Sequence, residues 1–234
     1  MEIIIIIILI ILQSIFGIGL LLFGTPTFIL FGYSFAETLS LLLPISILIS
    51  LIQIFFSKKK NMNFIKNFNL YCIPSLVISI YFILNFSDEI NFDLFISLMI
   101  IFIFFISLFK NFFIFKGYFA KLFLVLIGIV HGLSNLGGTL LSLMAISLSK
   151  DDKNASRFLI SYGYFAMASF QYLTLSFLGK NVFDINNFYY LILVIIIYFP
   201  VQIMFKKIDS QKFNKLIYFL ALLYGFYIFA KSII

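Results

Sequence analysis

Two short polar stretches interrupt otherwise apolar segments, and their residue types suit the binding of an anion. Threonine before proline is typical of a helix N-cap followed by the first helical turn, and a preceding glycine lets the backbone bend. A helix that begins inside an apolar segment presents free N–H groups and the positive end of its dipole. Two such helix starts facing one cavity would bind an anion without a buried arginine. The stretches are Gly24-Thr25-Pro26 and Gly137-Gly138-Thr139.

These glycines have a second interpretation, which is that they only allow helices to pack closely, as small residues do in membranes. Other polar residues accompany the stretches. His131 is the only histidine and lies beside the second one. An ionisable group inside a membrane segment is a functional-site candidate by default. His131 could bind the anion, carry a coupling proton near neutral pH, or be a neutral side chain bonded to a carbonyl group.

Four further polar residues complete the candidate site. Ser134 and Asn135 follow His131 on the same turn and are candidate substrate contacts. Gln53 and Gln171 lie late in two helices that match in sequence. Their amide groups suit an oxyanion but equally join helices to one another. We interpret the phenylalanine and tyrosine side chains as mostly facing lipid or packing.

The remaining ionisable residues have simpler interpretations. Glu37 is an interfacial charge at a helix start or a coupling carboxylate. Arg157, the only arginine, fits the rule that positive residues flank membrane segments on the cytoplasmic side better than it fits substrate binding. Cys72 is the only cysteine, which excludes a CxxC redox pair and a cysteine metal site. We therefore expect no metal and no cofactor.

Composition places these residues in a membrane protein. The chain has 234 residues, of which 63% are hydrophobic and only 11% are charged, whereas soluble domains carry about 25% charged residues. A spanning helix needs about 20 apolar residues, so the length allows about six to eight spans. The net charge of +7 lies in short loops and does not indicate nucleic-acid binding. The N-terminal apolar run has no basic n-region and no cleavage site, so we expect a retained membrane segment.

The hydrophobic runs predict an all-α, polytopic membrane protein with about eight segments. The first and fifth segments are the longest, and each contains one of the two polar interruptions, so both are expected to be broken or re-entrant. The predicted segments are 3–31, 36–56, 70–86, 93–109, 119–146, 157–178, 187–205 and 213–233.

The order of these segments predicts two copies of a four-segment unit within one membrane domain. The first repeat is 1–109, the cytoplasmic connection is 110–118, and the second repeat is 119–234. When Ser50-Leu-Ile-Gln53 is aligned with the region of Gln171, Pro44 falls opposite Tyr162 and Ser46 opposite Tyr164.

Charge distribution favours an inverted arrangement of the two repeats. If the fifth segment is a re-entrant hairpin, 14 Lys/Arg residues lie in cytoplasmic connections and only Lys180 and Lys231 lie outside. If all eight segments span fully, almost no asymmetry remains. The positive-inside rule therefore favours the hairpin. Inverted repeats with broken segments are a recurring architecture of secondary transporters, but the charges do not decide whether the first segment is a hairpin or a full span.

Two longer stretches resemble the first-half and second-half signatures of the TauE/SafE sulfite-exporter-like family of permeases. They occur in the same order as in the family, and the resemblance covers nearly the whole chain. One reads Gly24-Thr-Pro-Thr-Phe-Ile-Leu-Phe-Gly32 followed by Leu41-Leu-Leu-Pro44-x-Ser46, and the other Gly128-x2-His131-Gly132-Leu-Ser134-x2-Gly137-Gly138-Thr139. The chain is short for the family, and its first interruption has fewer glycines. The resemblance implies an inner-membrane permease that moves sulfite, sulfoacetate, thiosulfate or a related organic anion, often by export.

We therefore predict a multi-pass secondary transporter of a small anion that works by alternating access. H⁺ is a candidate coupling ion, and a homodimer is a possible assembly that the sequence does not decide. The substrate and the direction of transport stay undetermined. Three alternatives remain: an anion channel, a non-transporting membrane component, and an intramembrane hydrolase using Ser134 and His131. The last lacks the Gly-x-Ser-x-Gly elbow and an acidic partner, so we expect no enzymatic activity.

Overall fold

The computed structural model is built from helices in every part of the chain that it describes. It describes residues 2–86, 115–150, 152–180 and 187–213, with isolated positions at 98, 99, 102, 215, 216 and 219. The predicted segment 93–109 and most of 213–233 therefore lie outside the described residues. The helices are α1 (Glu2–Phe16), α2 (Leu20–Leu30), α3 (Phe35–Phe55), α4 (Met62–Asn67), the π-helical turn η1 (Phe68–Cys72), α5 (Ile73–Phe86), α7 (Gly117–Ser134), α8 (Gly138–Ser149), α9 (Lys153–Phe177) and α10 (Phe188–Lys207).

Among the described residues, four helices are long and apolar enough to cross a membrane, which indicates a membrane protein. They are α3, the continuous run Met62–Phe86, α7 and α10. Many large apolar side chains on the outside of the bundle are exposed, among them Phe55, Ile78 and Ile196. A surface of this kind is stable when the surrounding solvent is lipid.

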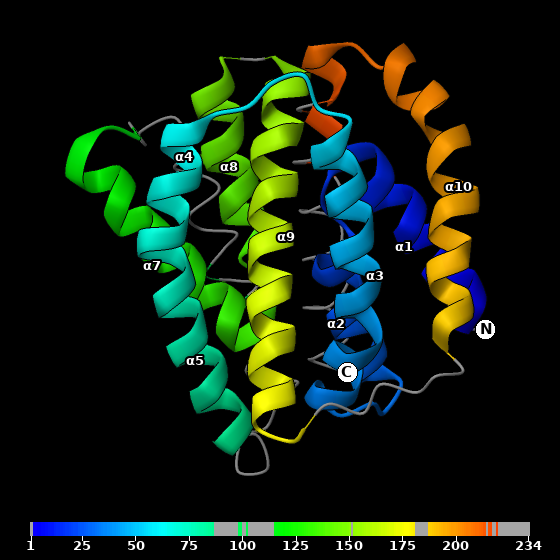
Figure 1. Ribbon diagram of the computed structural model, residues 1–234, viewed down its shortest axis with the longest axis vertical. Coiled ribbons are helices and arrows are strands. Elements are labelled where there is room, and N and C mark those ends of the chain that lie inside the picture. Colours follow the sequence, from blue (N-terminus) through cyan, green and yellow to red (C-terminus); the bar gives the residue numbers. More distant parts are fainter. Residues whose placement is uncertain are drawn as a thin grey trace.

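Helix α9, of 25 residues, lies in the middle of the molecule, packed along α3 and also against α8 and α5 (Figure 1). It is more polar than the four apolar helices and buries Ser161, Arg157 and Gln171. Because other helices surround α9, it does not need an apolar surface on every side. Its polar side chains are therefore available to the interior of the bundle.

The first predicted segment is a helical hairpin of α1 and α2. Gly17 and Gly19 adopt φ angles of 78° and 139°, which favour glycine, and α2 begins at Leu20. A Cβ atom on Gly19 would lie 2.9 Å from the Cβ of Leu12, so the chain folds back closely on α1. The hydroxyl of Tyr33, just after α2, donates to the Glu2 carboxylate at 2.9 Å. Both ends of the hairpin therefore lie together, and segment 1 is two helices and not one.

The predicted helix start at Thr25-Pro26 is wrong, because both residues lie inside α2, which begins more than a full turn earlier. Proline costs an interior helix one hydrogen bond, but the chain reversal lies upstream, where Gly17 and Gly19 provide the positive φ angles that it needs. Gly24 is a packing glycine, since its Cβ would lie 2.7 Å from Leu42 and 3.0 Å from Leu9. At this position the close-packing interpretation holds.

The fifth predicted segment is also a hairpin, formed by α7 and α8. Asn135 ends α7 in the left-handed conformation, with φ of 62°. A Cβ atom on Gly137 would lie 2.6 Å from the Cβ of His131, so the reversal is again tight. Figure 1 shows α7 entering from one edge of the molecule and α8 running back beside α9. The predicted interruption is confirmed, although α8 begins at Gly138 and not at Thr139.

Three helix boundaries in the first half of the chain recur 118 residues later. Other boundaries differ, since α2 and α8 end 119 residues apart and α3 and α9 end 122 residues apart. In Figure 1, α3 and α9 run in opposite directions, and so do α5 and α10. The pairs are Phe16 and Ser134, Leu20 and Gly138, and the N-caps Ser34 and Asp152.

Other boundaries differ modestly from the predicted ones. The predicted loop 57–69 is shorter, because α4 begins at Met62 after Asn61, whose side chain accepts from the Phe64 N–H. Helix α9 begins four residues early, with Asp152 as its N-cap, so Arg157 lies inside the helix and not at its start. Glu37 accepts from the backbone N–H of Ser34 at 2.8 Å and completes a capping box, which agrees with its interfacial interpretation.

The basic connections meet at one end of the bundle. Lys59, between α3 and α4, pairs with Asp152 at 3.4 Å. Lys153 Nζ donates to the carbonyl oxygens of Phe205 and Ile208 at the end of α10. Lys180 lies at the other end, where its ammonium group donates to the Leu84 carbonyl. The hydrogen bonds to Asp152 from the Asn154 and Ala155 N–H groups and its pairing with Lys59 outweigh its partial burial and lower the pKa of its carboxyl group.

Candidate functional site

The reversal at residues 135–137, which we call the second tip, carries a connected set of buried polar side chains. Asn135 Nδ2 donates to Thr25 Oγ1 at 2.9 Å. Gln171 Nε2 donates to Asn135 Oδ1 at 2.7 Å and to the His131 carbonyl oxygen at 3.4 Å. All four residues are 0% exposed. The structure therefore joins four of the predicted site residues, taken from α2, α7, the second tip and α9.

His131 lies in this set with its imidazole unsatisfied. The side chain is fully buried, and neither Nδ1 nor Nε2 has a hydrogen-bond partner. The Gln171 side chain lies close enough to the imidazole to interact with it electrostatically, but its Oε1 atom has no partner within hydrogen-bonding geometry. Buried polar groups are nearly always hydrogen-bonded, so each exception needs an explanation. A bound ligand or water would supply the missing partners.

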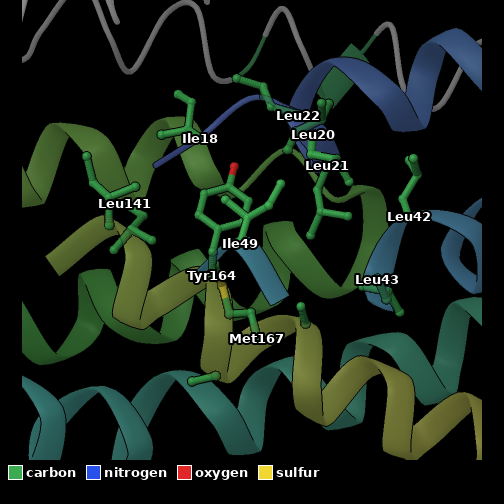
Figure 2. Packing of buried hydrophobic residues seen from close by; sticks show 14 of the residues in the cluster. Ile18, Leu20, Leu21, Leu22, Leu42, Leu43, Ile49, Leu141, Tyr164 and Met167 are labelled. Atoms are coloured by element: carbon green, nitrogen blue, oxygen red, sulfur yellow. The ribbon is translucent and has the colours of Figure 1, made fainter. Parts of the chain in front are cut away.

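Tyr164 completes the site and was not among the predicted residues. Its hydroxyl is buried without a partner, and its ring lies edge-on to His131 with a centroid distance of 5.7 Å. A Cβ atom on Gly138 would overlap this hydroxyl, so Tyr164 covers the first residue of α8. Figure 2 shows the ring among aliphatic side chains that include Ile18, Ile49 and Leu141. The sequence hint for Tyr164 was its position opposite Ser46 when the two halves of the chain are aligned.

Two predicted residues have more limited roles. Ser134 donates its hydroxyl to the Val130 carbonyl oxygen at 2.8 Å, within its own helix. It is therefore not hydrogen-bonded to His131, and its donor is occupied. Thr139 is the second residue of α8, is 7% exposed, and donates its backbone N–H to the Leu136 carbonyl oxygen at 3.2 Å. It lies beside the helix start and does not cap it.

Gln53 belongs to a separate set of hydrogen-bonded side chains beside the reversal at residues 17–19. We call this reversal the first tip. Its Nε2 atom donates to the carbonyl oxygens of Gln13 at 2.7 Å and Ser14 at 3.2 Å. Its Oε1 atom accepts from the Ser161 hydroxyl at 2.7 Å. Gln13 in turn donates to the Ser46 hydroxyl at 2.9 Å. The structure thus separates Gln53 from the other predicted residues.

The two tips are built alike. The Gly17 N–H donates to the Gln13 carbonyl oxygen at 2.8 Å, and the Asn135 N–H donates to the His131 carbonyl oxygen at 2.8 Å. In each half a glutamine on the following long helix also bonds to that same carbonyl, Gln53 to residue 13 and Gln171 to residue 131. Both tips leave buried polar atoms without partners, namely Gln13 Oε1 and Ser14 Oγ at the first.

The second tip offers groups that suit a small oxyanion. Helix α8 is 12 residues long and begins next to the hydroxyl of Tyr164, so backbone N–H groups and a hydroxyl donor lie together. The N-terminal end of a helix carries about half a positive charge, which favours an anion. Within the described part of the chain, no group of three His, Cys, Asp or Glu side chains is placed to hold a metal ion.

Comparison with family models, with curated proteins and with solved structures finds no match to this chain.

Proposed function

We propose that the protein is a secondary transporter of a small organic or sulfur-containing anion, such as sulfite, sulfoacetate or thiosulfate, and works as an exporter in the inner membrane. The observation that carries the proposal is the second tip. There, unpartnered groups of His131, Tyr164 and Gln171 surround the start of a half-length helix in the interior of the bundle. A purely structural core has no need to bury unsatisfied polar groups.

The proposal includes an inverted repeat. The spacing of 118 residues at three helix boundaries, the opposite directions of α3 and α9, and the matched carbonyl contacts of Gln53 and Gln171 support it. Two copies of one fold in opposite orientations have two states of similar energy, open to opposite sides. The hairpins α1–α2 and α7–α8 are then re-entrant, each entering from one face of the bilayer and returning to it.

The basic end of the bundle supports an orientation for this arrangement. The connection from α3 to α4, the end of α8 and the C-terminal end of α10 lie together at that end (Figure 1), and they carry Lys59, Lys150 and Lys207. The positive-inside rule assigns this end to the cytoplasm. The α7–α8 hairpin then opens to the cytoplasm and the α1–α2 hairpin to the outside. Non-helical backbone at the depth of the tips is tolerated where it lines a cavity or is enclosed by protein.

In the proposed mechanism the anion binds at the start of α8. Backbone N–H groups and the Tyr164 hydroxyl donate to its oxygens, and Asn135 and Thr139 shape the site. His131 either donates to the anion or carries a coupled proton. One hairpin then moves against the central pair α3–α9 and exposes the site to the opposite face. The resemblance to the TauE/SafE family supports the same class of substrate.

The test is flux of radiolabelled sulfite and sulfoacetate in proteoliposomes. We compare the native chain with Tyr164→Phe, which removes only the hydroxyl, and with Thr139→Val. Tyr162→Phe is the matched control, because its hydroxyl bonds to Asn69 at an exposed position on the same helix. The site is supported if flux is saturable, if Tyr164→Phe slows it and if Tyr162→Phe leaves it unchanged. We expect Tyr164→Phe to slow flux by about tenfold, which corresponds to about 1.4 kcal/mol of binding free energy.

Other outcomes separate the parts of the proposal. Saturable flux that is equal in all four proteins supports a transporter and rejects the site at the second tip. Flux that does not saturate and shows no counterflow indicates a channel. Absence of flux for these two anions and for a wider set of carboxylates and sulfonates, with folded protein, contradicts transport.

A further inference from the structure

Arg157 is a buried cation without a counter-ion. The residue is only 9% exposed, and its Nη2 atom donates to the Tyr198 hydroxyl oxygen at 2.9 Å and to Gln202 Oε1 at 2.7 Å. The ring of Phe205 lies 4.0 Å from its Cζ atom. None of these partners carries a negative charge. Among the described residues, the ion pairs are Lys59 with Asp152 and Lys212 with Asp209, and neither involves Arg157.

The group around Arg157 has more hydrogen-bond donors than acceptors. Both bonds of the guanidinium come from Nη2, so the N–H groups of Nε and Nη1 donate to no protein atom that the structure describes. The Tyr198 hydroxyl accepts from Arg157, and its own proton has no acceptor there. Gln202 Nε2 connects the group to the carbonyl oxygen of Ser14 at 3.3 Å, and the buried Ser14 hydroxyl lacks a partner. An oxyanion would supply both the charge and the acceptors that are missing.

A cation that only follows the positive-inside rule would extend its head group to water, since long basic side chains reach the interface from a helix end. Arg157 instead turns inward, onto Tyr198 and Gln202 of α10. Isolated charges in membrane segments are costly and mark binding or transport pathways. Lys153, a second cation on the same helix, is already occupied by carbonyl groups at the end of α10.

The position of Arg157 suits a first encounter with an anion. It lies one turn inside α9. The first turn of α9 is at the end of the bundle where Lys59 pairs with Asp152 and Lys153 bonds to the end of α10. Several positive charges gathered at one end of a protein attract anions and raise their local concentration. The Arg157 group also adjoins the first tip, because the Ser161 hydroxyl donates to both the Arg157 carbonyl oxygen and Gln53 Oε1, each at 2.7 Å.

We propose that Arg157, with Tyr198 and Gln202, forms a second anion-binding site that takes a small carboxylate or sulfonate from the side of the basic connections. This inference rests on the proposed function and deepens it, because it assigns the same class of ligand to a site apart from the second tip. Binding at this site can be measured whether or not the chain transports the anion.

A tryptophan reporter gives a direct measurement. The chain has no tryptophan, and Phe205 lies against the guanidinium, so Phe205→Trp places a unique fluorophore at the site. Purified full-length protein in detergent is titrated with sulfoacetate, and with uncharged acetamide as the control probe. We expect a saturable change in tryptophan emission with sulfoacetate only. Adding Arg157→Gln should weaken the apparent affinity at least tenfold, and Lys207→Gln, which removes an exposed charge at the same end, should change it less than threefold.

A second variant tests the same proposal if Arg157→Gln does not fold. Gln202→Glu places a carboxylate within 2.7 Å of Nη2, where the native amide now lies. This internal counter-ion should raise the melting temperature of the ligand-free chain and abolish its further stabilisation by sulfoacetate, which the native chain should show by mass action. Sulfoacetate that stabilises Gln202→Glu and the native chain equally would overturn the proposal, as would equal losses of binding in Arg157→Gln and Lys207→Gln.

The two proposals fail separately. Saturable binding reported by the Phe205→Trp variant, without flux, rejects transport and keeps the Arg157 site. The Arg157 site is rejected, and transport is kept, by three results together. Flux occurs with a KM that Gln202→Glu leaves unchanged, the reporter variant shows no saturable signal, and sulfoacetate does not stabilise the native chain.

Discussion

The side-chain amide of Asn135 donates a hydrogen bond of 2.9 Å to the hydroxyl oxygen of Thr25, 110 residues earlier in the chain. The bond joins the second tip to the middle of α2, and so connects the two hairpins directly. Both residues are fully buried, and Asn135 also accepts from Gln171. A single amide thus holds together three parts of the bundle that the proposed transport cycle must move.

We predict that Thr25→Val lowers stability because it leaves the Asn135 amide with an unpaired N–H. Interhelical hydrogen bonds in membrane proteins contribute about 0.6 kcal/mol on average, and an unsatisfied buried donor costs about 1–3 kcal/mol. The free energy of unfolding in mixed detergent micelles should fall by about 1–2 kcal/mol. Thr174→Val is the control, because the Thr174 hydroxyl lies at the surface and bonds to Phe170 of its own helix. Equal effects of the two substitutions would contradict the contact.

We predict that Gly138→Ala is destabilising because the added Cβ overlaps the Tyr164 hydroxyl. Overpacking of this kind costs about 1–3 kcal/mol. Gly163→Ala is a matched control on α9, since its Cβ would meet a Leu141 methyl at 2.5 Å, the end of a flexible side chain. Gly163→Ala should therefore cost less.

Thermal unfolding in detergent checks this, together with the double variant Gly138→Ala, Tyr164→Leu. Removing the hydroxyl and the rigid ring should make the double variant more stable than the sum of the two single effects. Strict additivity would show that Tyr164 does not cover the start of α8.

We predict that His131→Gln reduces the pH dependence of flux, because the amide cannot take up a proton. His131 is the only histidine of the chain, so no other imidazole can replace it. Flux is measured in proteoliposomes with equal pH on both sides, and then with an imposed pH gradient. Asn135 and Gln171 remain in place in this variant and keep the geometry of the second tip. A rate and a pH profile equal to those of the native chain would reject the proton role.

We predict that cysteines at the two ends of the bundle are labelled from opposite sides of the membrane. Cys72 is buried and is replaced by serine in the background protein. Cysteine at Lys58 or Lys207 should react with an impermeant maleimide only after the cells are permeabilised, and cysteine at Lys180 should react in intact cells. Residues 58 and 180 reacting from the same side would contradict the inverted arrangement.

A second labelling pair addresses the first hairpin. Because Tyr33 bonds to Glu2, the start of α1 and the end of α2 lie on one side, which the proposed orientation places outside. Cysteine at Ser34 should therefore react together with cysteine at Lys180. Reaction of the Ser34 position from the cytoplasm would show that the α1–α2 hairpin enters from the other face.

Composition and periodicity alone determined the helical class and most helix boundaries to within a few residues. The runs 36–56 and 187–205 correspond to α3 and α10, because an apolar segment of about 20 residues surrounded by lipid can satisfy its backbone only as a helix. The second tip was also readable, since Gly137-Gly138 follows a polar turn. The charges predicted a cytoplasmic side rich in lysine, which stays a prediction; in the structure Lys59 pairs with Asp152, and the neighbouring Lys153 bonds to the end of α10.

Only the tertiary structure decided where the first hairpin reverses and which polar side chains meet. The sequence motif Thr25-Pro26 has the chemistry of a helix start, but a reversal needs positive φ angles, and these belong to Gly17 and Gly19. The contacts of Tyr164 with Gly138, and of Arg157 with Tyr198, join distant segments and leave no local pattern. Local propensity fixes whether a residue is helical, whereas the partner of a buried polar group depends on how whole helices pack.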